Sequence, residues 1–287
     1  MNIRTTGLLA LGAAALATAP TQPAQAQFGA APTEVELIQL NDDMYVISNV
    51  AVPGLVTVLV TDEGVLLVDD KFEIDHDNIM ALVRTVTDQP VKYVINTHYH
   101  GDHSGGNARL QALDAIAVAS DQARNRMVAA NQSGQPDFTF PDTTSIYIGG
   151  KTVQLHRVNP AHTDGDVVVL FPDYNVIATG DIFANGPGTS AQLVDAAGGG
   201  SAKSWPSAVE QALALEFETV VPGHGLISTR ADLEAYLQRT MRFSQVLDEL
   251  VSQGRSRDEI EQIVRSDFAW EDFHVNMALD GLIAEFE

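Results

Sequence analysis

The sequence predicts an α/β chain in which sheets are covered by helices, and three observations predict this fold class. Between residues 35 and 68, short segments rich in Val, Ile and Leu follow one another as strands. From residue 74 to residue 225, strand-like segments alternate with segments whose apolar residues recur at helical spacing. The last sixty residues have helical patterns only. Because there is no internal repeat and no linker, we expect one domain over residues 27–287.

Residues 1–26 have the features of a secretory signal peptide. Arg4 gives a basic start, residues 8–17 form an apolar stretch too short to span a bilayer, and small residues precede a cleavage site after Ala26. We therefore expect a mature chain that begins at Gln27. It should be periplasmic or secreted, without insertion into the membrane.

The first elements after this leader form an antiparallel meander that leads to a helix. The expected strands are residues 35–40, 44–48, 55–61 and 65–68, with a turn at residues 61–64. Residues 74–86 place Ile79, Leu82, Val83 and Val86 on one helical face. Residues 91–95 return to strand.

Strands and helices then alternate to the end of the chain. The pattern predicts a short helix that closes at residues 110–113, a strand at 116–119, a helix at 121–131, four strands at 145–148, 153–158, 167–171 and 176–179, a helix at 205–215 and a strand at 219–221. Residues 186–201 are rich in Gly, Ala and Ser and predict a long functional loop. In the C-terminal helical part, Thr229 with Asp232 and Ser256 with Glu259 have the spacing of N-terminal capping boxes.

Composition restricts the partners and the ligands that the chain can use. The formal net charge is −22, and removal of Arg4 with the leader makes it −23 (−22 − 1). Such a charge repels phosphate backbones, so we expect a small-molecule substrate and no nucleic acid. The chain has no Cys, so any metal site must use His, Asp or Glu. The oligomeric state stays open.

The strongest functional signal is the run of residues 97–103, Thr-His-Tyr-His-Gly-Asp-His. In extended backbone, residues two apart point the same way, so His98, His100 and Asp102 converge, while Gly101 relaxes the backbone and lets His103 turn to a neighbouring point. An isolated His-x-His is often a polar surface turn. Here three further candidates, His162, Asp181 and His224, also lie beside strands, where a metal site on a sheet edge would be built.

These residues resemble the His-x-His-x-Asp-His signature of the metallo-β-lactamase superfamily, followed in order by His, Asp and His. The resemblance spans nearly all of the mature chain. It implies a four-layer αββα sandwich, here with extra C-terminal helices. It further implies that His98, His100 and His162 hold a first zinc ion, that Asp102, His103 and His224 hold a second, and that Asp181 bridges the two.

Two zinc ions suit neutral imidazoles and carboxylates as ligands. They lower the pKa of a shared water enough to give hydroxide near neutral pH, and this hydroxide attacks the carbonyl carbon of an amide or ester. Asp102 is expected to orient the hydroxide or to shuttle a proton, besides binding metal. The chain is therefore expected to be an exported metallo-hydrolase.

Departures from the family pattern bear on the substrate. The commonest zinc β-lactamases have Cys at the position of Asp181 and Lys three residues on, where this chain has Ala184. Asp181 and residues 179–183 resemble glyoxalase II and the lactonases instead, although basic residues for glutathione are lacking. Length, the export signal and a loop at residues 49–55 favour β-lactams as the first substrate class. A lactonase or thioesterase, an iron-dependent sulfur dioxygenase and a non-catalytic metal-binding periplasmic protein remain alternatives.

Other candidates carry weaker signals. Asp69 matches a family position that supports metal ligands, although capping of a turn explains it equally well. Lys203 and Asn185 flank the long loop and are interpreted first as solvated. His76, His156 and His274 are interpreted as surface or packing histidines.

Overall fold

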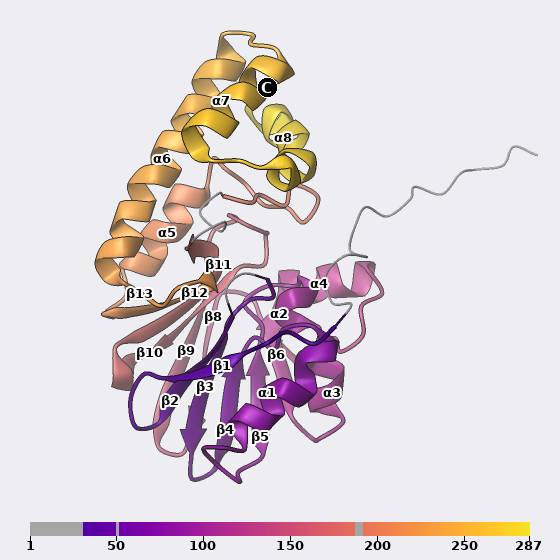
Figure 1. The fold of residues 1–287 in the computed structure, drawn as a ribbon, viewed down its shortest axis with the longest axis vertical. Coiled ribbons are helices and arrows are strands. Elements are labelled where there is room, and N and C mark those ends of the chain that lie inside the picture. The colour runs from indigo at the N-terminus through magenta and orange to yellow at the C-terminus, as the bar shows by residue number, and fades with distance from the viewer. Residues whose placement is uncertain (1–30, 50–51, 187–191) are drawn as a thin grey trace, which may run out of the picture.

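The computed structural model describes residues 31–49, 52–186 and 192–287. The expected signal peptide at residues 1–26 lies outside the described residues. In the described part, two sheets face each other and helices cover their outer faces (Figure 1). The α/β class and the αββα layering with extra C-terminal helices are therefore confirmed.

The first sheet has seven strands in sequence order, β1 to β7. Their bounds are β1 Glu36–Gln39, β2 Met44–Ser48, β3 Val56–Thr61, β4 Gly64–Val68, β5 Val91–Ile95, β6 Ile116–Ser120 and β7 Phe138–Phe140. Strands β1 to β4 pair antiparallel, which confirms the expected meander. Strands β4 to β7 pair parallel, so their carboxyl ends meet at one edge.

The second sheet has six strands in the order β13-β12-β11-β10-β9-β8. Their bounds are β8 Thr143–Ile148, β9 Lys151–Arg157, β10 Val167–Phe171, β11 Val176–Asn185, β12 Thr219–Gly225 and β13 Ser228–Thr229. Only β11 and β12 pair parallel, and their register shifts around Gly180. Along this irregular pair, the chain runs from the interior of the sheet to the edge where polar residues lie.

The helices are α1 His76–Val83, α2 Gly101–Ser104, α3 Asn107–Gln111, α4 Asp121–Ala129, α5 Trp205–Leu213, α6 Arg230–Ser252, α7 Arg257–Phe268 and α8 Asp272–Phe286, with short 3₁₀ turns η2 Glu73–Asp75 and η3 Pro172–Tyr174. Both expected capping boxes form: Thr229 caps α6 with Asp232, and Ser256 caps α7 with Glu259. These reciprocal bonds satisfy amides that the first helical turn leaves free.

Three apolar clusters account for the layers. The central cluster takes Met44, Leu59 and Ile95 from the first sheet and Leu155 and Val169 from the second, so it fills the space between the sheets. A second cluster packs α1 and α3 on the outer face of the first sheet. The third and largest packs α5 to α8 on the outer face of the second sheet. Burial of these apolar faces is the main force that holds the layers together.

Several element boundaries differ from the sequence prediction. Strand β11 continues six residues past Thr179 to Asn185, and β12 continues to Gly225, because each pairs with the other beyond its apolar run. Strands β7 and β13 were not predicted, since three and two residues give no readable alternation. No helix in the described ranges has the length and apolar character needed to cross a bilayer.

Candidate metal centre

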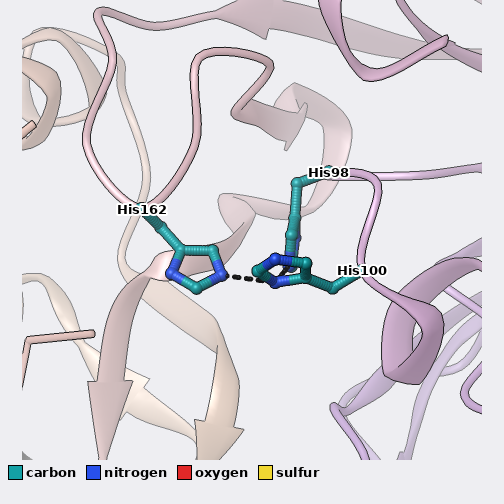
Figure 2. Close-up of side chains that lie close together, drawn as sticks. All are labelled: His98, His100 and His162. Atoms are coloured by element: carbon teal, nitrogen blue, oxygen red, sulfur yellow. Dashed lines mark hydrogen bonds between the residues drawn. The ribbon is translucent and has the colours of Figure 1, made fainter. Parts of the chain in front are cut away.

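His98, His100 and His162 converge from two loops (Figure 2). His98 follows β5, His100 is the N-cap of α2, and His162 lies in the loop between β9 and β10. The Nδ1 atom of His100 lies 3.1 Å from Nε2 of His98 and 2.8 Å from Nε2 of His162. His98 and His162 are each 1% exposed. One imidazole nitrogen from each residue therefore points to a common point.

Asp102, His103 and His224 form a second group beside the first. Nε2 of His103 lies 3.3 Å from Nε2 of His224, and the Asp102 carboxylate lies 3.4 Å from His224 and 3.7 Å from His103. Helix α2 carries Asp102 and His103, whereas His224 stands near the end of β12. The second group thus joins the first sheet to the second.

The Asp181 carboxylate lies between the two groups. Its Oδ2 atom is 3.9 Å from His98, 3.4 Å from His162 and 3.3 Å from His224, and its Oδ1 atom is 3.1 Å from His103. It stands on β11 just after Gly180, whose positive φ of 54° and close approach to the Thr97 side chain favour glycine. The position suits a residue that contacts both groups.

The donor set fits zinc. A tetrahedral ion with zinc–nitrogen bonds of about 2.05 Å separates its nitrogen ligands by roughly 3.3 Å. The nitrogen pairs in both groups lie at 2.8 to 3.3 Å. Burial lowers the pKa of His98 well below its usual value and that of His162 to about 4, which keeps both rings neutral. Neutral imidazole is the form that binds metal.

Burial alone would raise the pKa of Asp181, but His103, His224 and His162 lower it well below its usual range. Its carboxylate is therefore ionised. All seven predicted side chains lie together. Their spacing fits that of residues that surround bound cations. Such imidazole and carboxylate ligands can hold a metal ion that acts as a Lewis acid.

Asp69 supports this centre from behind. Its Oδ2 atom lies 2.8 Å from Nδ1 of His103 and accepts a hydrogen bond from the Thr97 hydroxyl, and its Oδ1 atom accepts one from the Thr97 amide. The carboxylate therefore fixes the His103 ring so that Nε2 faces Asp181 and His224. Of the two interpretations of Asp69, the contacts favour support of a metal ligand over capping of a turn.

Asp195 and Tyr99 contact the candidate ligand His100 or its partner, and the sequence did not single them out. Asp195 Oδ2 lies 3.0 Å from Nε2 of His100 and also accepts a hydrogen bond from the Tyr99 hydroxyl. Burial would raise the pKa of Asp195, but His100 and Tyr99 hold it well below its usual range. Nearby, the Leu193 carbonyl lies 2.5 Å from Nδ1 of His162. Asp195 stands in the Gly- and Ala-rich segment, where no periodicity marks it.

The described part of the loop at residues 49–55 is held against the site. The Gly54 amide donates to the Asp102 carbonyl, and the Leu55 amide donates to the Gly223 carbonyl. Lys71, which is fully buried, donates to the Asn49 side chain and to the Gly54 carbonyl. Lys71 was not predicted, because its role depends on tertiary burial.

Lys203 and Asn185 belong to neither ligand group. Lys203 donates to the Glu285 carbonyl, and Asn185 donates to the Ser228 hydroxyl. Among the described residues, His76, His156 and His274 belong to no cluster with metal-ligand spacing. Burial lowers the pKa of each of these three histidines, as expected for packing residues.

Comparison with known proteins gives the family of the chain. The sequence profile of the metallo-beta-lactamase superfamily matches residues 50–224. The type 2 metallo-beta-lactamase of Bacillus cereus is 25% identical over 205 residues, which cover 68% of this chain and 78% of that protein. The type 2 enzyme of Bacteroides fragilis is 25% identical over 207 residues, covering 67% of this chain and 80% of that protein.

Solved structures give the same fold. A metallo-beta-lactamase from Pontibacter korlensis superposes with a TM-score of 0.64 at 23% identity, covering 72% of this chain and 99% of that one. The DIM-1 metallo-beta-lactamase also gives a TM-score of 0.64, at 16% identity, covering 73% of this chain and 98% of that one. The chain has a metallo-hydrolase fold and belongs to the metallo-beta-lactamase superfamily.

Proposed function

We propose that the mature chain is an exported hydrolase that binds two zinc ions and opens a cyclic amide or ester, with β-lactams as the first substrate class. The observation that carries the proposal is the position of Asp181, which lies within 3.9 Å of an imidazole nitrogen from each of four histidines. A carboxylate shared between two ligand groups can bridge two adjacent cations.

The proposed ligands divide as the sequence suggests. His98, His100 and His162 hold one zinc ion, Asp102, His103 and His224 hold the other, and Asp181 bridges them. When bound, the ions supply a water of lowered pKa and stabilise negative charge on the carbonyl oxygen. Asp102 is the most exposed carboxylate of the centre, at 19% of its side-chain surface, so it can accept the proton of an entering water and pass it outward.

The relatives named as metallo-beta-lactamases and the N-terminal leader pattern support the β-lactam assignment. Asp181 in place of Cys supports lactones or thioesters as the next classes. The test is a hydrolysis panel of penicillins, cephalosporins, carbapenems, lactones and thioesters, run on zinc-loaded mature protein. Turnover of a β-lactam is expected. Turnover of lactones or thioesters alone would reassign the substrate, and no hydrolysis of any class would overturn the proposal.

Two variants distinguish hydrolysis at the proposed site from hydrolysis by a trace contaminant in this panel. Asp102→Ala removes a carboxylate that lies 3.4 Å from His224, and we expect hydrolysis to fall by roughly 100-fold or more. Asp88→Ala, which changes an exposed acid far from the centre, is expected to leave the rate unchanged. Equal rates for Asp102→Ala and the wild type would remove Asp102 from the mechanism.

The same preparation tests the identity of the metal and the export of the chain. Elemental analysis that finds iron, together with oxygen uptake on a persulfide, would instead indicate a sulfur dioxygenase. N-terminal sequencing of protein from the periplasm or medium should find Gln27 at the start. Material that still begins at Met1 would contradict export with cleavage.

A further inference from the structure

A buried ammonium group lies behind the second ligand group. Lys71 follows β4 and is 0% exposed. Its Nζ atom donates hydrogen bonds to the Asn49 side chain and to the Gly54 carbonyl. A buried charge is costly unless hydrogen-bond partners surround it, so these acceptors help to keep the ammonium inside the protein. Because both acceptors precede β3, Lys71 fixes that part of the chain to the end of β4.

The side chain of Lys71 is charged at neutral pH. Burial lowers its pKa to about 8, against the opposing effect of the charges of Asp75, Asp102 and Asp69. A group with this pKa keeps its proton at pH 7 in most molecules. The bonds to Asn49 and Gly54 are therefore bonds from a charged donor, which are stronger than those between neutral groups.

The backbone that presents this side chain has an unusual conformation. Asp69 has a φ of 62° and Lys71 a φ of 59°, both in the left-handed region that residues other than glycine rarely adopt. Such a conformation costs free energy and persists only where surrounding contacts hold it. One such contact is the hydrogen bond from the Gly105 amide to the Lys71 carbonyl, at 2.9 Å. The two side chains are thereby directed to the His103 ring and to Gly54.

Residues 52–55 join the two segments that carry the second ligand group. The Gly54 amide donates to the Asp102 carbonyl at 3.2 Å, and the Leu55 amide donates to the Gly223 carbonyl at 2.8 Å. The first bond reaches α2, and the second reaches β12 directly before the proposed histidine ligand of that strand. This short segment therefore bridges the two sheets at the metal centre.

Gly54 also lies against the ring of His103. A Cβ atom at Gly54 would lie 2.2 Å from Cε1 of His103 and 2.7 and 2.8 Å from its two ring nitrogens. These distances are too short for any side chain, so the backbone itself forms the contact. Since His103 is 0% exposed, the place of Gly54 limits the position that the ring can take.

We propose that Lys71 is a positioning residue for the second ligand group and that it acts through residues 52–55. Its ammonium fixes the Gly54 carbonyl, and the Gly54 amide then fixes the Asp102 backbone. The same segment keeps the His103 ring in place. The inference rests on the proposed dinuclear centre and assigns this lysine to one of its two metal sites.

The first ligand group is held by other contacts. Asp195 lies 3.0 Å from Nε2 of His100, and the Leu193 carbonyl lies 2.5 Å from Nδ1 of His162. Both partners belong to the segment between β11 and α5. Loss of the buried ammonium is therefore expected to weaken the second zinc site and to spare the first.

Zinc titration and amide hydrogen exchange of the mature protein test this role. Lys71→Met removes the ammonium, and Asn49→Ala removes one of its acceptors at a partly exposed position. Lys92→Met is the matched control, because it removes the same charge from an exposed position on β5. The binding step that is lost in His224→Ala identifies the second zinc site.

Lys71→Met should weaken the second zinc-binding step by roughly 10- to 100-fold and leave the first within about twofold. In the metal-free protein it should speed exchange of the Gly54 and Leu55 amides by roughly tenfold or more. Asn49→Ala should change both readouts in the same direction by less, because the Gly54 carbonyl still accepts from the ammonium. Lys92→Met should behave as the wild type.

A rescue experiment separates the charge from the packing of the side chain. Because the chain has no Cys, Lys71→Cys can be alkylated at this one position in denaturant and then refolded. Alkylation with 2-bromoethylamine restores an ammonium at nearly the length of lysine, whereas 1-iodopropane gives an uncharged chain of the same size. The aminoethyl form should recover the second zinc-binding step of wild type refolded in the same way, and the propyl form should not.

Equal weakening of both zinc-binding steps in Lys71→Met, or equal recovery with the two alkyl groups, would show that Lys71 only fills space and would overturn the inference. Unchanged exchange at Gly54 and Leu55 would also overturn it. If Lys71→Met does not fold, Asn49→Ala and the alkylated pair give the decision. Fewer than two zinc ions in the wild type would overturn the dinuclear centre instead, and exchange in the metal-free protein then decides whether Lys71 fixes residues 52–55.

Discussion

Asp69 binds three groups of the metal centre at once: the His103 ring and the amide and hydroxyl of Thr97. Carboxylates that orient a metal-bound histidine typically change metal affinity 10- to 100-fold when replaced. We predict that Asp69→Asn, which tolerates the positive φ of 62°, weakens zinc binding by roughly that factor in a competition titration.

Asp70→Asn is the control for this experiment, since Asp70 is equally buried but accepts its hydrogen bond from the Gly106 amide. Burial raises the pKa of Asp70 well above its usual value, so loss of its charge should matter little. Zinc affinity in Asp69→Asn as high as in Asp70→Asn would show that Asp69 has only a structural role.

His162 makes the metal-free chain sensitive to acid. Burial lowers its pKa from the ordinary 6.5 to about 4 in the folded state. As the pH falls, the unfolded chain takes up this proton first, so stability is lost between pH 6.5 and about 4. Between pH 7 and pH 5 we predict a loss of about 2 kcal/mol from this residue.

Urea unfolding of the metal-free protein at the two pH values measures this loss, and His162→Gln removes the titrating ring. The wild type should lose about 2 kcal/mol more than His162→Gln. An identical pH dependence in both proteins would contradict the depressed pKa.

At the residue scale, position beside a predicted strand marked several candidate ligands, and the family resemblance assigned their proposed roles. His98 follows β5, His162 lies in the loop before β10, and His224 lies near the end of β12. Asp195 and Lys71 were beyond sequence reasoning. Asp195 sits in an unpatterned segment, and Lys71 gains its contacts from Gly54 and Asn49, which lie 17 and 22 positions before it in the chain.

At the scale of elements, two glycines next to proposed ligands differ in whether a Cβ atom would fit. A Cβ at Gly223 in β12 would lie 2.0 Å from Oδ1 of Asp181, whereas a Cβ at Gly101 in α2 would meet Phe72 at an ordinary 3.8 Å. Gly101 also has no positive φ. The flexibility that the sequence suggested for Gly101 is therefore not needed, because α2 begins at that residue with helical geometry.

We predict that Gly223→Ala displaces Asp181 and lowers zinc binding and hydrolysis by at least roughly tenfold, because the backbone of β11 leaves the carboxylate little room to move. Gly101→Ala should bind zinc as the wild type does. Isothermal titration with zinc checks both variants. Normal zinc binding by Gly223→Ala would mean that Asp181 does not need its present position.

Element prediction succeeded where burial on one or both faces gave a clear pattern, as in β2, β5 and β10, whose bounds match the predicted ranges. It stopped short in β11, because residues 180–185 leave the apolar pattern and are held as strand by pairing with β12. Long-range pairing is a tertiary effect that local propensity does not encode.

At the scale of the whole molecule, the C-terminal helices reach back to the metal centre. Glu285 on α8 accepts hydrogen bonds from the Ala202 and Lys203 amides and from the Ser201 hydroxyl. Gly281 packs so closely that a Cβ would lie 2.4 Å from Ala196. The segment held in this way contains Asp195. The helices therefore help to position His100, a proposed metal ligand.

We predict that Glu285→Ala increases amide hydrogen exchange in residues 192–202 and weakens zinc binding severalfold, whereas Glu249→Ala, an exposed acid on α6, does neither. Hydrogen-exchange mass spectrometry of the zinc-loaded protein gives the first readout and a zinc titration the second. Unchanged exchange in this segment would show that α8 packs on it without stabilising it.

The central claim is that one chain holds two zinc ions around Asp181. Elemental analysis of mature protein after equilibrium dialysis against zinc tests it most directly. Two zinc ions per chain in the wild type, falling to one in Asp181→Ala or His224→Ala, is the predicted result. One zinc ion or none in the wild type would contradict the dinuclear centre.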